Sequence, residues 1–174
     1  MSMLQLPEVL NHFNVYEDGD VLVGQDADIE LPEFTAITDT LSGSGILGEI
    51  EDPVTGQYES ATMTIKWAVI NKDYFRIIDP TRPKTMTLRG SVQMMDTSTG
   101  ETDYKPIKIV VRGKAKNIAL GKFEKGKKME NEVEIEIMYI KITSDKTTLL
   151  ELDKLNFKFV LNGEDKLAKI RAQV

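Results

Sequence analysis

The sequence predicts a mainly β protein: an antiparallel β-sandwich or rolled barrel with one flanking α-helix. Three observations support this class. Apolar and polar side chains alternate with period two in several segments, as in strands with one buried face. Turn-forming pairs such as Asp18-Gly19 and Thr99-Gly100 lie between such segments. Antiparallel neighbours need only short links, so the strands are expected to pair in that way. A length of 174 residues suits one domain, spanning 1–174.

The strands follow in order along the chain. Asp18-Gly19 predicts a tight hairpin between segments near Val15 and Val21, and Thr99-Gly100 lies between the strands of Val92 and Ile107. Five alternating sets predict one face each of the later strands: Ala61, Met63, Ile65 and Trp67; Met86, Leu88, Gly90 and Val92; Ile107, Ile109 and Val111; Val133, Ile135, Ile137 and Tyr139; Leu155, Phe157, Phe159 and Leu161.

Polar residues occupy the opposite faces of two of these strands. On one strand they are small or basic: Ser60, Thr62, Thr64 and Lys66. On the other they are four glutamates: Glu130, Glu132, Glu134 and Glu136. Four carboxylates on one face cannot be buried unpaired, so this face must meet water or cations.

Two segments have helical features. Residues 71–78 form a short pattern that ends before Asp79-Pro80, where proline disfavours helical geometry in the preceding residue. Near the C-terminus, Leu167, Ala168 and Ile170 after Asn162-Gly163 are compatible with a short helix, a final strand or a tail.

Residues 38–57 (TDTLSGSGILGEIEDPVTGQ) are rich in glycine and contain Pro53, so a regular element is not expected there. A loop this long inside a compact domain is usually functional or disordered. Because Ile46, Leu47 and Ile50 lie within it, we expect an arm that docks on another surface.

Composition narrows the function classes. The chain has 22 basic and 28 acidic residues, a net charge of −6, with no cysteine and one histidine. Residues 1–65 contain 13 acidic and no basic side chains, and the remainder carries 22 basic and 15 acidic ones, a net charge of +7. Either this split steers one copy onto another or folding brings the halves together and the field cancels. No apolar run is long enough for a membrane span, so no membrane partner is expected.

The common catalytic and ligand-binding designs are not supported. The lone histidine, His12, is expected at the surface or in packing rather than in a catalytic triad. The i, i+2 pairs Asp26/Asp28 and Glu132/Glu134 describe any solvated β face as well as a hydrolase pair. The GxGxxG match at 43–48 has no preceding buried parallel strand and no following helix. We therefore expect no enzyme activity, cofactor or metal.

A basic segment spans residues 105–128, where Glu124 is the one acidic residue. Its cations are Lys105, Lys108, Arg112, Lys114, Lys116, Lys122, Lys125, Lys127 and Lys128. Phe123 alone interleaves them, whereas nucleic-acid grooves combine charge with several stacking aromatics. The alternatives are an inert solvated loop and a loop that contacts an acidic protein surface.

Several short motifs, in order, resemble the major tail tube proteins of contractile-tailed bacteriophages. They are residues 6–16 (LPEVLNHFNVY), 22–24 (LVG), 30–32 (ELP), 40–46 (TLSGSGI), 48–49 (GE), 155–157 (LNF), 162–163 (NG) and 167–171 (LAKIR). The resemblance implies a structural subunit that assembles into hexameric rings stacked as a tube, with hairpins from all subunits joining an inner barrel. It further implies contacts with tail sheath, tape measure, baseplate and tail terminator proteins. The location would be the virion tail or a tail-like bacteriocin, assembled in the cytoplasm of the bacterial host.

Two roles are assigned as hypotheses within that family. The inter-ring assembly loop comprises Leu41, Ser42, Gly43, Ser44, Gly45, Ile46, Leu47, Gly48, Glu49 and Ile50. The lumen-facing candidates are Ser60, Thr62, Thr64, Glu130, Glu132, Glu134 and Glu136, because an acidic or neutral wall would not hold DNA phosphates. The alternative is that the glutamates lie outside or pair with lysines of the next strand. The alternative functions are a tube subunit of a type VI or extracellular injection system and a monomeric carbohydrate-binding β-sandwich.

Overall fold

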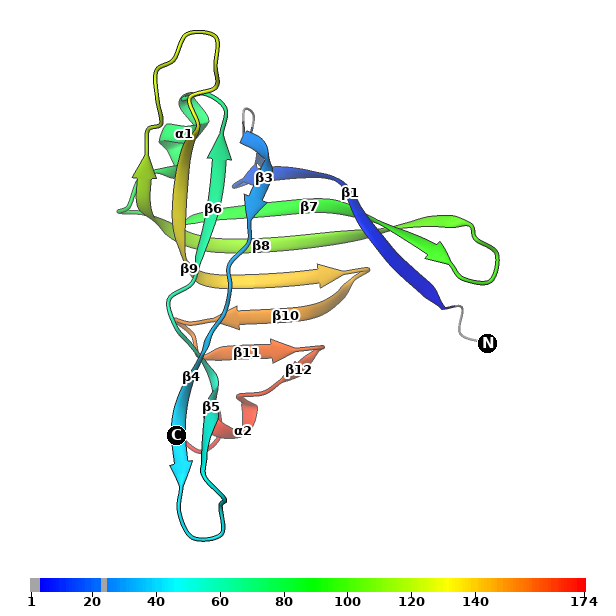
Figure 1. Cartoon of the computed structure of the whole chain (residues 1–174), viewed down its shortest axis with the longest axis vertical. Coiled ribbons are helices and arrows are strands. Elements are labelled where there is room, and N and C mark those ends of the chain that lie inside the picture. Colours follow the sequence, from blue (N-terminus) through cyan, green and yellow to red (C-terminus); the bar gives the residue numbers. More distant parts are fainter. Residues whose placement is uncertain (1–3, 23–24) are drawn as a thin grey trace.

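The computed structural model describes residues 4–22 and 25–174, and most of them lie in antiparallel strands (Figure 1). The elements are β1 Gln5–Glu17, β2 Asp20–Val21, β3 Gln25–Glu30, β4 Ala36–Ser42, β5 Glu49–Tyr58, β6 Thr62–Trp67, α1 Lys72–Ile77, β7 Lys84–Asp96, β8 Thr102–Ala119, β9 Asn131–Ser144, β10 Thr147–Asp153, β11 Lys158–Leu161, β12 Glu164–Asp165 and α2 Ala168–Arg171.

Ten strands form one sheet. Eight of them follow the order β12-β11-β10-β9-β8-β7-β1-β2, and the other two lie off this path, where β6 pairs with β9 and β3 pairs with β6. A second sheet consists of β4 and β5 alone. All recorded pairings are antiparallel. The predicted class is confirmed as mainly β and antiparallel, but within the described residues the large sheet stays open rather than closing into a barrel.

The large sheet rolls because two long strands bend together. In β9, residues 131–136 pair with β6 and residues 139–144 pair with β10, and the two parts run in different directions in Figure 1. Opposite them, the register of β8 shifts between Arg112 and Gly113, which leaves Met138 as the extra residue of a bulge. Gly113 is required here, since a Cβ would lie 2.1 Å from the carbonyl oxygen of Glu136.

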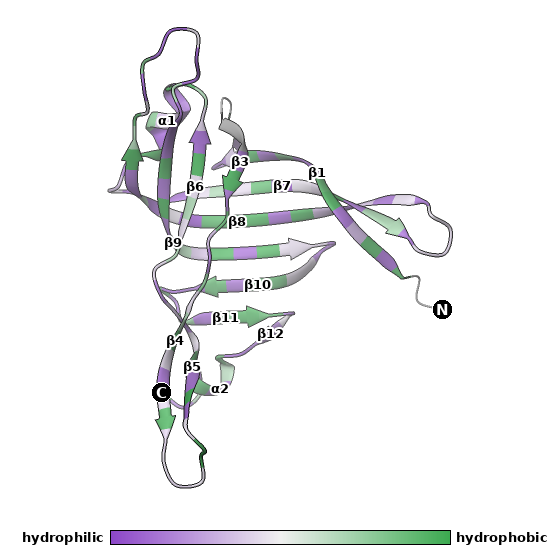
Figure 2. Cartoon of the chain, viewed as in Figure 1, coloured by the Kyte–Doolittle hydropathy of each residue, from purple (hydrophilic) through white to green (hydrophobic). Residues whose placement is uncertain are grey.

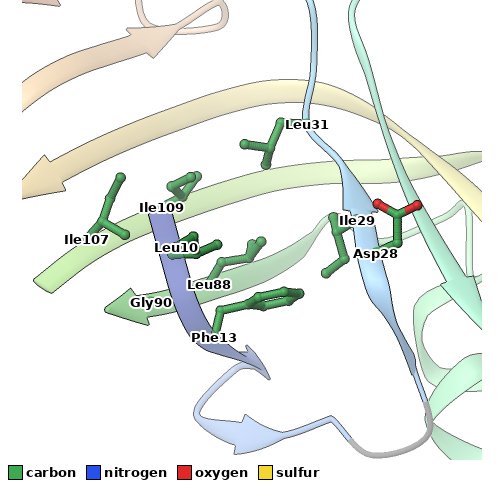
Figure 3. Close-up of a pocket in the computed structure, with 9 residues that line it drawn as sticks. All are labelled: Leu10, Phe13, Asp28, Ile29, Leu31, Leu88, Gly90, Ile107 and Ile109. Atoms are coloured by element: carbon green, nitrogen blue, oxygen red, sulfur yellow. The ribbon is translucent and has the colours of Figure 1, made fainter. Parts of the chain in front are cut away.

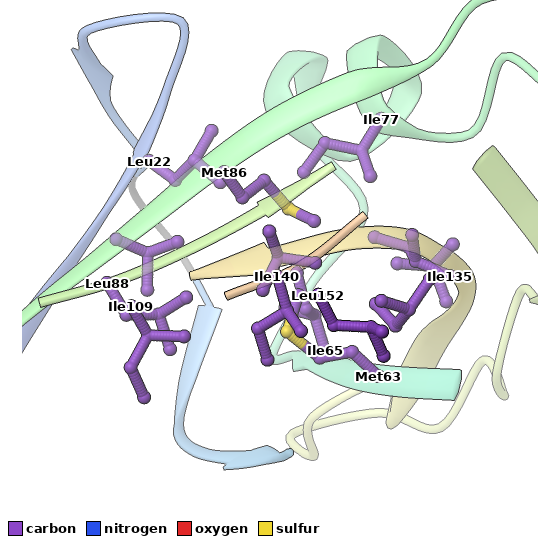
Figure 4. Close-up of a cluster of buried hydrophobic side chains, with 14 of the residues drawn as sticks. Leu22, Met63, Ile65, Ile77, Met86, Leu88, Ile109, Ile135, Ile140 and Leu152 are labelled. Atoms are coloured by element: carbon purple, nitrogen blue, oxygen red, sulfur yellow. The ribbon is translucent and has the colours of Figure 1, made fainter. Parts of the chain in front are cut away.

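The bend encloses the hydrophobic core, shown in Figure 4. The predicted inward positions 61, 63, 65 and 67 are all buried, as are 86, 109, 111, 133, 135 and 137. Trp67 is fully buried and meets the Tyr74 ring edge-on, with centroids 6.1 Å apart. Figure 2 shows the same alternation as changing colour along the strands.

The predicted helix within residues 71–78 forms, and of the alternatives for the C-terminal segment the short helix is the one observed. The Asn71 side chain accepts a hydrogen bond from the Tyr74 amide at 2.9 Å and caps α1, which ends at Ile77 with Ile78 as its C-cap, just before Asp79-Pro80. The buried Tyr74 hydroxyl donates to the Ala119 carbonyl at 3.0 Å, fixing α1 beside β8. The short α2 follows Leu167. Both predicted hairpin turns also occur, with Glu17 opposite Asp20 and with 97–101 joining β7 to β8.

Three expectations were wrong in detail. Residues 38–57 are not irregular, because most of them belong to β4 and β5. Tyr139 is not on the face of Ile137, because the bulge at Met138 reverses the alternation and makes Ile140 the buried residue. The last predicted strand begins only at Lys158, since Phe157 adopts a left-handed conformation (φ 51°) in a turn.

Candidate functional site

The hairpin β4–β5 stands away from the rest of the molecule (Figure 1). Its register places Leu41 opposite Ile50 and Ser42 opposite Glu49, so residues 43–48 form the turn. At its base the Tyr58 ring packs edge-on against both Phe34 and Phe159, with centroid distances of 5.8 and 5.7 Å. The base is therefore anchored to the core while the outer part is free of it.

Every residue from 41 to 50 is exposed. The side chain of Leu47 is fully in contact with water, with a relative exposure of 105%, and Ile46 and Ile50 are exposed at 37% and 52%. Gly45 and Gly48 have φ values of 95° and 93°, which other residues rarely adopt, so the turn geometry depends on them. An apolar tip on a projecting hairpin has the form of a contact surface rather than of core structure.

The hairpin is acidic, and two of its carboxylates lie opposite each other on paired strands. Between residues 36 and 58 there are four acidic residues and no Lys or Arg. Asp39 lies directly opposite Asp52, an arrangement that destabilises a strand pair. Neither these two nor Glu49 and Glu51 form an ion pair with any residue that the structure describes. A two-stranded hairpin is only marginally stable alone, so this one is suited to being covered by a partner.

A second candidate surface is the polar face of β6 and β9. The register pairs Thr62 with Glu136, Thr64 with Glu134 and Lys66 with Glu132, so these side chains share one face, opposite the core. Ser60 lies two residues before β6, and its hydroxyl donates to a carboxylate oxygen of Glu136 at 2.8 Å.

Cations neutralise only part of this face. Lys116 lies 3.4 Å from the Glu136 carboxylate, so the alternative of pairing with a lysine of the next strand holds for that residue. Lys66 binds Glu30 at 2.7 Å instead, and that hydrogen bond raises the pKa of Lys66. Glu132 and Glu134 form no ion pair among the described residues.

Glu130 does not belong to the strand alternation from which it was predicted. It precedes β9 and has a φ of 55°, so the period of two does not reach it. It nevertheless lines a hollow together with Lys66 and Glu132, at the end of the same face.

An exposed apolar surface along β1 was missed. Leu6, Val9 and Leu10 are each at least half exposed, and Leu10 overhangs a hollow of about 230 Å³ shown in Figure 3. Gly90 opens this hollow, since a Cβ there would lie 2.7 Å from the Leu10 side chain. The signal was present as apolar residues at 4, 6, 9 and 10, but they follow no single period because the β1–β7 register shifts twice in this stretch.

The candidates for chemistry on this chain are its one histidine and its possible metal ligands. His12 is exposed on β1, as expected of a surface residue. No cluster of three metal-ligating side chains occurs among the side chains that the structure describes. No helix within residues 4–22 and 25–174 is long and apolar enough to span a membrane. The prominent surfaces are a projecting hairpin, a carboxylate face and exposed strand edges.

Comparison with known proteins shows the family of this chain. The sequence model of the family described as phage tail tube protein FII matches residues 7–174. The chain belongs to this family. It is 24% identical to the tail tube protein of Escherichia phage P2 over 174 residues, covering 98% of this chain and 99% of that protein. It is 25% identical to the major tail tube protein of Serratia phage KSP20 over 164 residues, covering 93% and 92%. The chain is therefore a structural protein of the phage tail tube family, which is not a family of enzymes.

Proposed function

We propose that this tail tube protein assembles into hexameric rings that stack to form the inner tube of a contractile phage tail or tail-like particle. The tube would serve as a conduit for DNA and as a scaffold for the sheath. Family membership supports the tube, and the open ten-stranded sheet supports the ring. Exposed strand edges with unpaired backbone groups are satisfied when neighbouring subunits join their sheets.

The β4–β5 hairpin is proposed to form the contact between stacked rings. Its apolar tip and unpaired carboxylates lie outside the core, so the monomer gains little from them. A contact between such a tip and a different surface of the next copy is head-to-tail, and head-to-tail contacts propagate without closing. We therefore retain residues 41–50 as the inter-ring contact.

The shared face of β6 and β9 is proposed to line the channel. Its threonines and its glutamates without ion pairs would leave the wall neutral to acidic. Basic side chains bind DNA by neutralising its phosphates and releasing the counterions condensed on them, so a wall without such side chains would not retain the genome. The proposed partners are the sheath, tape measure, baseplate and terminator proteins, and the proposed location is the virion tail after assembly in the host cytoplasm. In a type VI or extracellular injection system the same stacking would occur without DNA.

Shortening the hairpin tests the stacking role. Replacing residues 42–49 with Asn-Gly joins the paired residues Leu41 and Ile50 by a two-residue turn. Circular dichroism should show an unchanged β-core, because every removed residue is exposed, while negative-stain microscopy should show no tubes. An unchanged yield of tubes would overturn the inter-ring assignment.

A further inference from the structure

Two projections lie at opposite ends of the long axis of the molecule (Figure 1). One is the acidic β4–β5 hairpin. The other is the connection between β8 and β9, residues 120–130, hereafter the basic loop. The inference drawn from them rests on the proposed stacking and names the surface that receives the hairpin.

The basic loop is fixed at its neck and exposed at its tip. The Lys122 amide donates to the Met129 carbonyl at 2.7 Å, and the Met129 amide donates to the Ala68 carbonyl at 2.8 Å. Gly121 permits this closure, since a Cβ would lie 2.0 Å from the Met129 carbonyl oxygen. The loop is therefore held as a defined projection rather than as a loose tether.

Beyond the neck, the basic loop presents charge around an exposed aromatic ring. Phe123 is 95% exposed there, and Leu120, just before the neck, is 54% exposed. The loop contains four lysines against two glutamates, and Figure 2 shows its outer part as largely hydrophilic. Lys127 pairs with Glu124, but Lys122 and Lys125 have no ion-pair partner among the described residues.

The hairpin has the complementary composition. Its tip offers Leu47 and Ile46, and behind them lie four carboxylates without ion pairs among the described residues. An apolar centre with a charged rim is the usual anatomy of a specific protein contact. Opposite charge in the rim mainly supplies orientation and a faster encounter.

We propose that the β4–β5 hairpin of one copy docks on the basic loop of the next copy along the tube axis. Leu47 packs against Phe123, and Glu49 and Glu51 lie near Lys122 and Lys125. Because the two surfaces are at opposite ends of one molecule, each added copy leaves a fresh hairpin or loop exposed, and growth continues.

Cysteine cross-linking tests the contact directly, because the chain has no cysteine of its own. Leu47→Cys with Phe123→Cys in one chain weakens the apolar contact, so its tubes are grown at a protein concentration raised to offset that loss. Mild oxidation of these tubes should give a ladder of covalent oligomers, whereas each single variant should give dimers at most. Leu47→Cys with Tyr104→Cys is the matched control, since Tyr104 is 58% exposed at the far end of the β7–β8 hairpin. Tubes without the ladder, or an equal ladder in the control, would overturn this contact while leaving the tube function intact. Absence of tubes in the unmodified protein would instead refute the proposed function.

Charge reversal gives a second readout. Lys122→Glu with Lys125→Glu should raise the concentration needed for polymerisation about tenfold, as should Glu49→Lys with Glu51→Lys. The four changes together should restore it to within about threefold of the original, since opposite charges face each other again. Lys146→Glu with Lys169→Glu, exposed residues outside both projections, is the control and should change little. A fourfold variant no better than its two parents would contradict the pairing.

Discussion

Truncating one side chain at the hairpin tip gives a quantitative prediction. Leu47→Ala removes three carbon atoms from a side chain that the single chain leaves wholly in water. Burial contributes about 0.8 kcal/mol per methylene, so the lost contact costs about 2 kcal/mol per subunit interface. That energy corresponds to a rise of about thirtyfold in the concentration needed for tube growth.

The assay separates assembly from folding. Pelleting or light scattering over a concentration series measures tube growth, and urea unfolding below the growth threshold measures monomer stability. Because Leu47 makes no core contact, its truncation should change the free energy of unfolding by less than about 0.5 kcal/mol. Leu47→Met, of similar volume, should grow tubes nearly normally. Growth of Leu47→Ala at the original concentration would refute the reasoning.

Three further predictions concern stability and the channel. Asp153 is buried, which alone would raise its pKa, but hydrogen bonds from Asn156 and Leu155 and the nearby Arg112 lower the pKa overall. Its ionised form therefore stabilises the fold above the ordinary aspartate pKa of about 3.9, and this contribution is lost as pH falls through the lowered pKa. The free energy of unfolding of Asp153→Asn, measured with urea across this range, should depend less on pH than that of the original protein. An equal pH dependence in the two proteins would contradict the assignment. Gly113→Ala should cost about 2–4 kcal/mol by the same assay, since its Cβ would meet backbone, whereas Gly90→Ala should cost less because the Leu10 side chain can move. Replacing Glu132, Glu134 and Glu136 with Lys should allow assembly but slow DNA ejection; normal ejection kinetics would show that this face is not in the channel.

Local signals explain which parts of the fold could be predicted. The Asn71 cap and the Asp79-Pro80 stop lie within the segment that they delimit, so α1 was located correctly. The residues of β6 alternate strictly between buried and partly exposed, because one face of the strand packs on the core along its whole length.

The features that the sequence did not predict are the β4–β5 strands and two interruptions of the alternation in and beside β9. The outer part of β4–β5 has both faces in water, so no apolar period marks it as strand, and its glycines indicate a loop. A bulge also leaves no recognisable pattern in the sequence, and the one at Met138 reverses the alternation of β9. At the other end of the strand, the left-handed conformation of Glu130 places it outside the alternation, which begins at Asn131. The family resemblance predicted a tail tube protein, which the comparisons confirm, but the opposite placement of the hairpin and the basic loop required the three-dimensional structure.

The central claim is that this chain is a self-assembling tube subunit, and electron microscopy of the purified protein tests it most directly. Negative-stain images and sedimentation should be recorded over a rising concentration series, with and without added tail components. A tube subunit should give rings at low concentration and tubes with a continuous channel as the concentration rises. Monodisperse monomers at high concentration, still without rings after tail components are added, would contradict it.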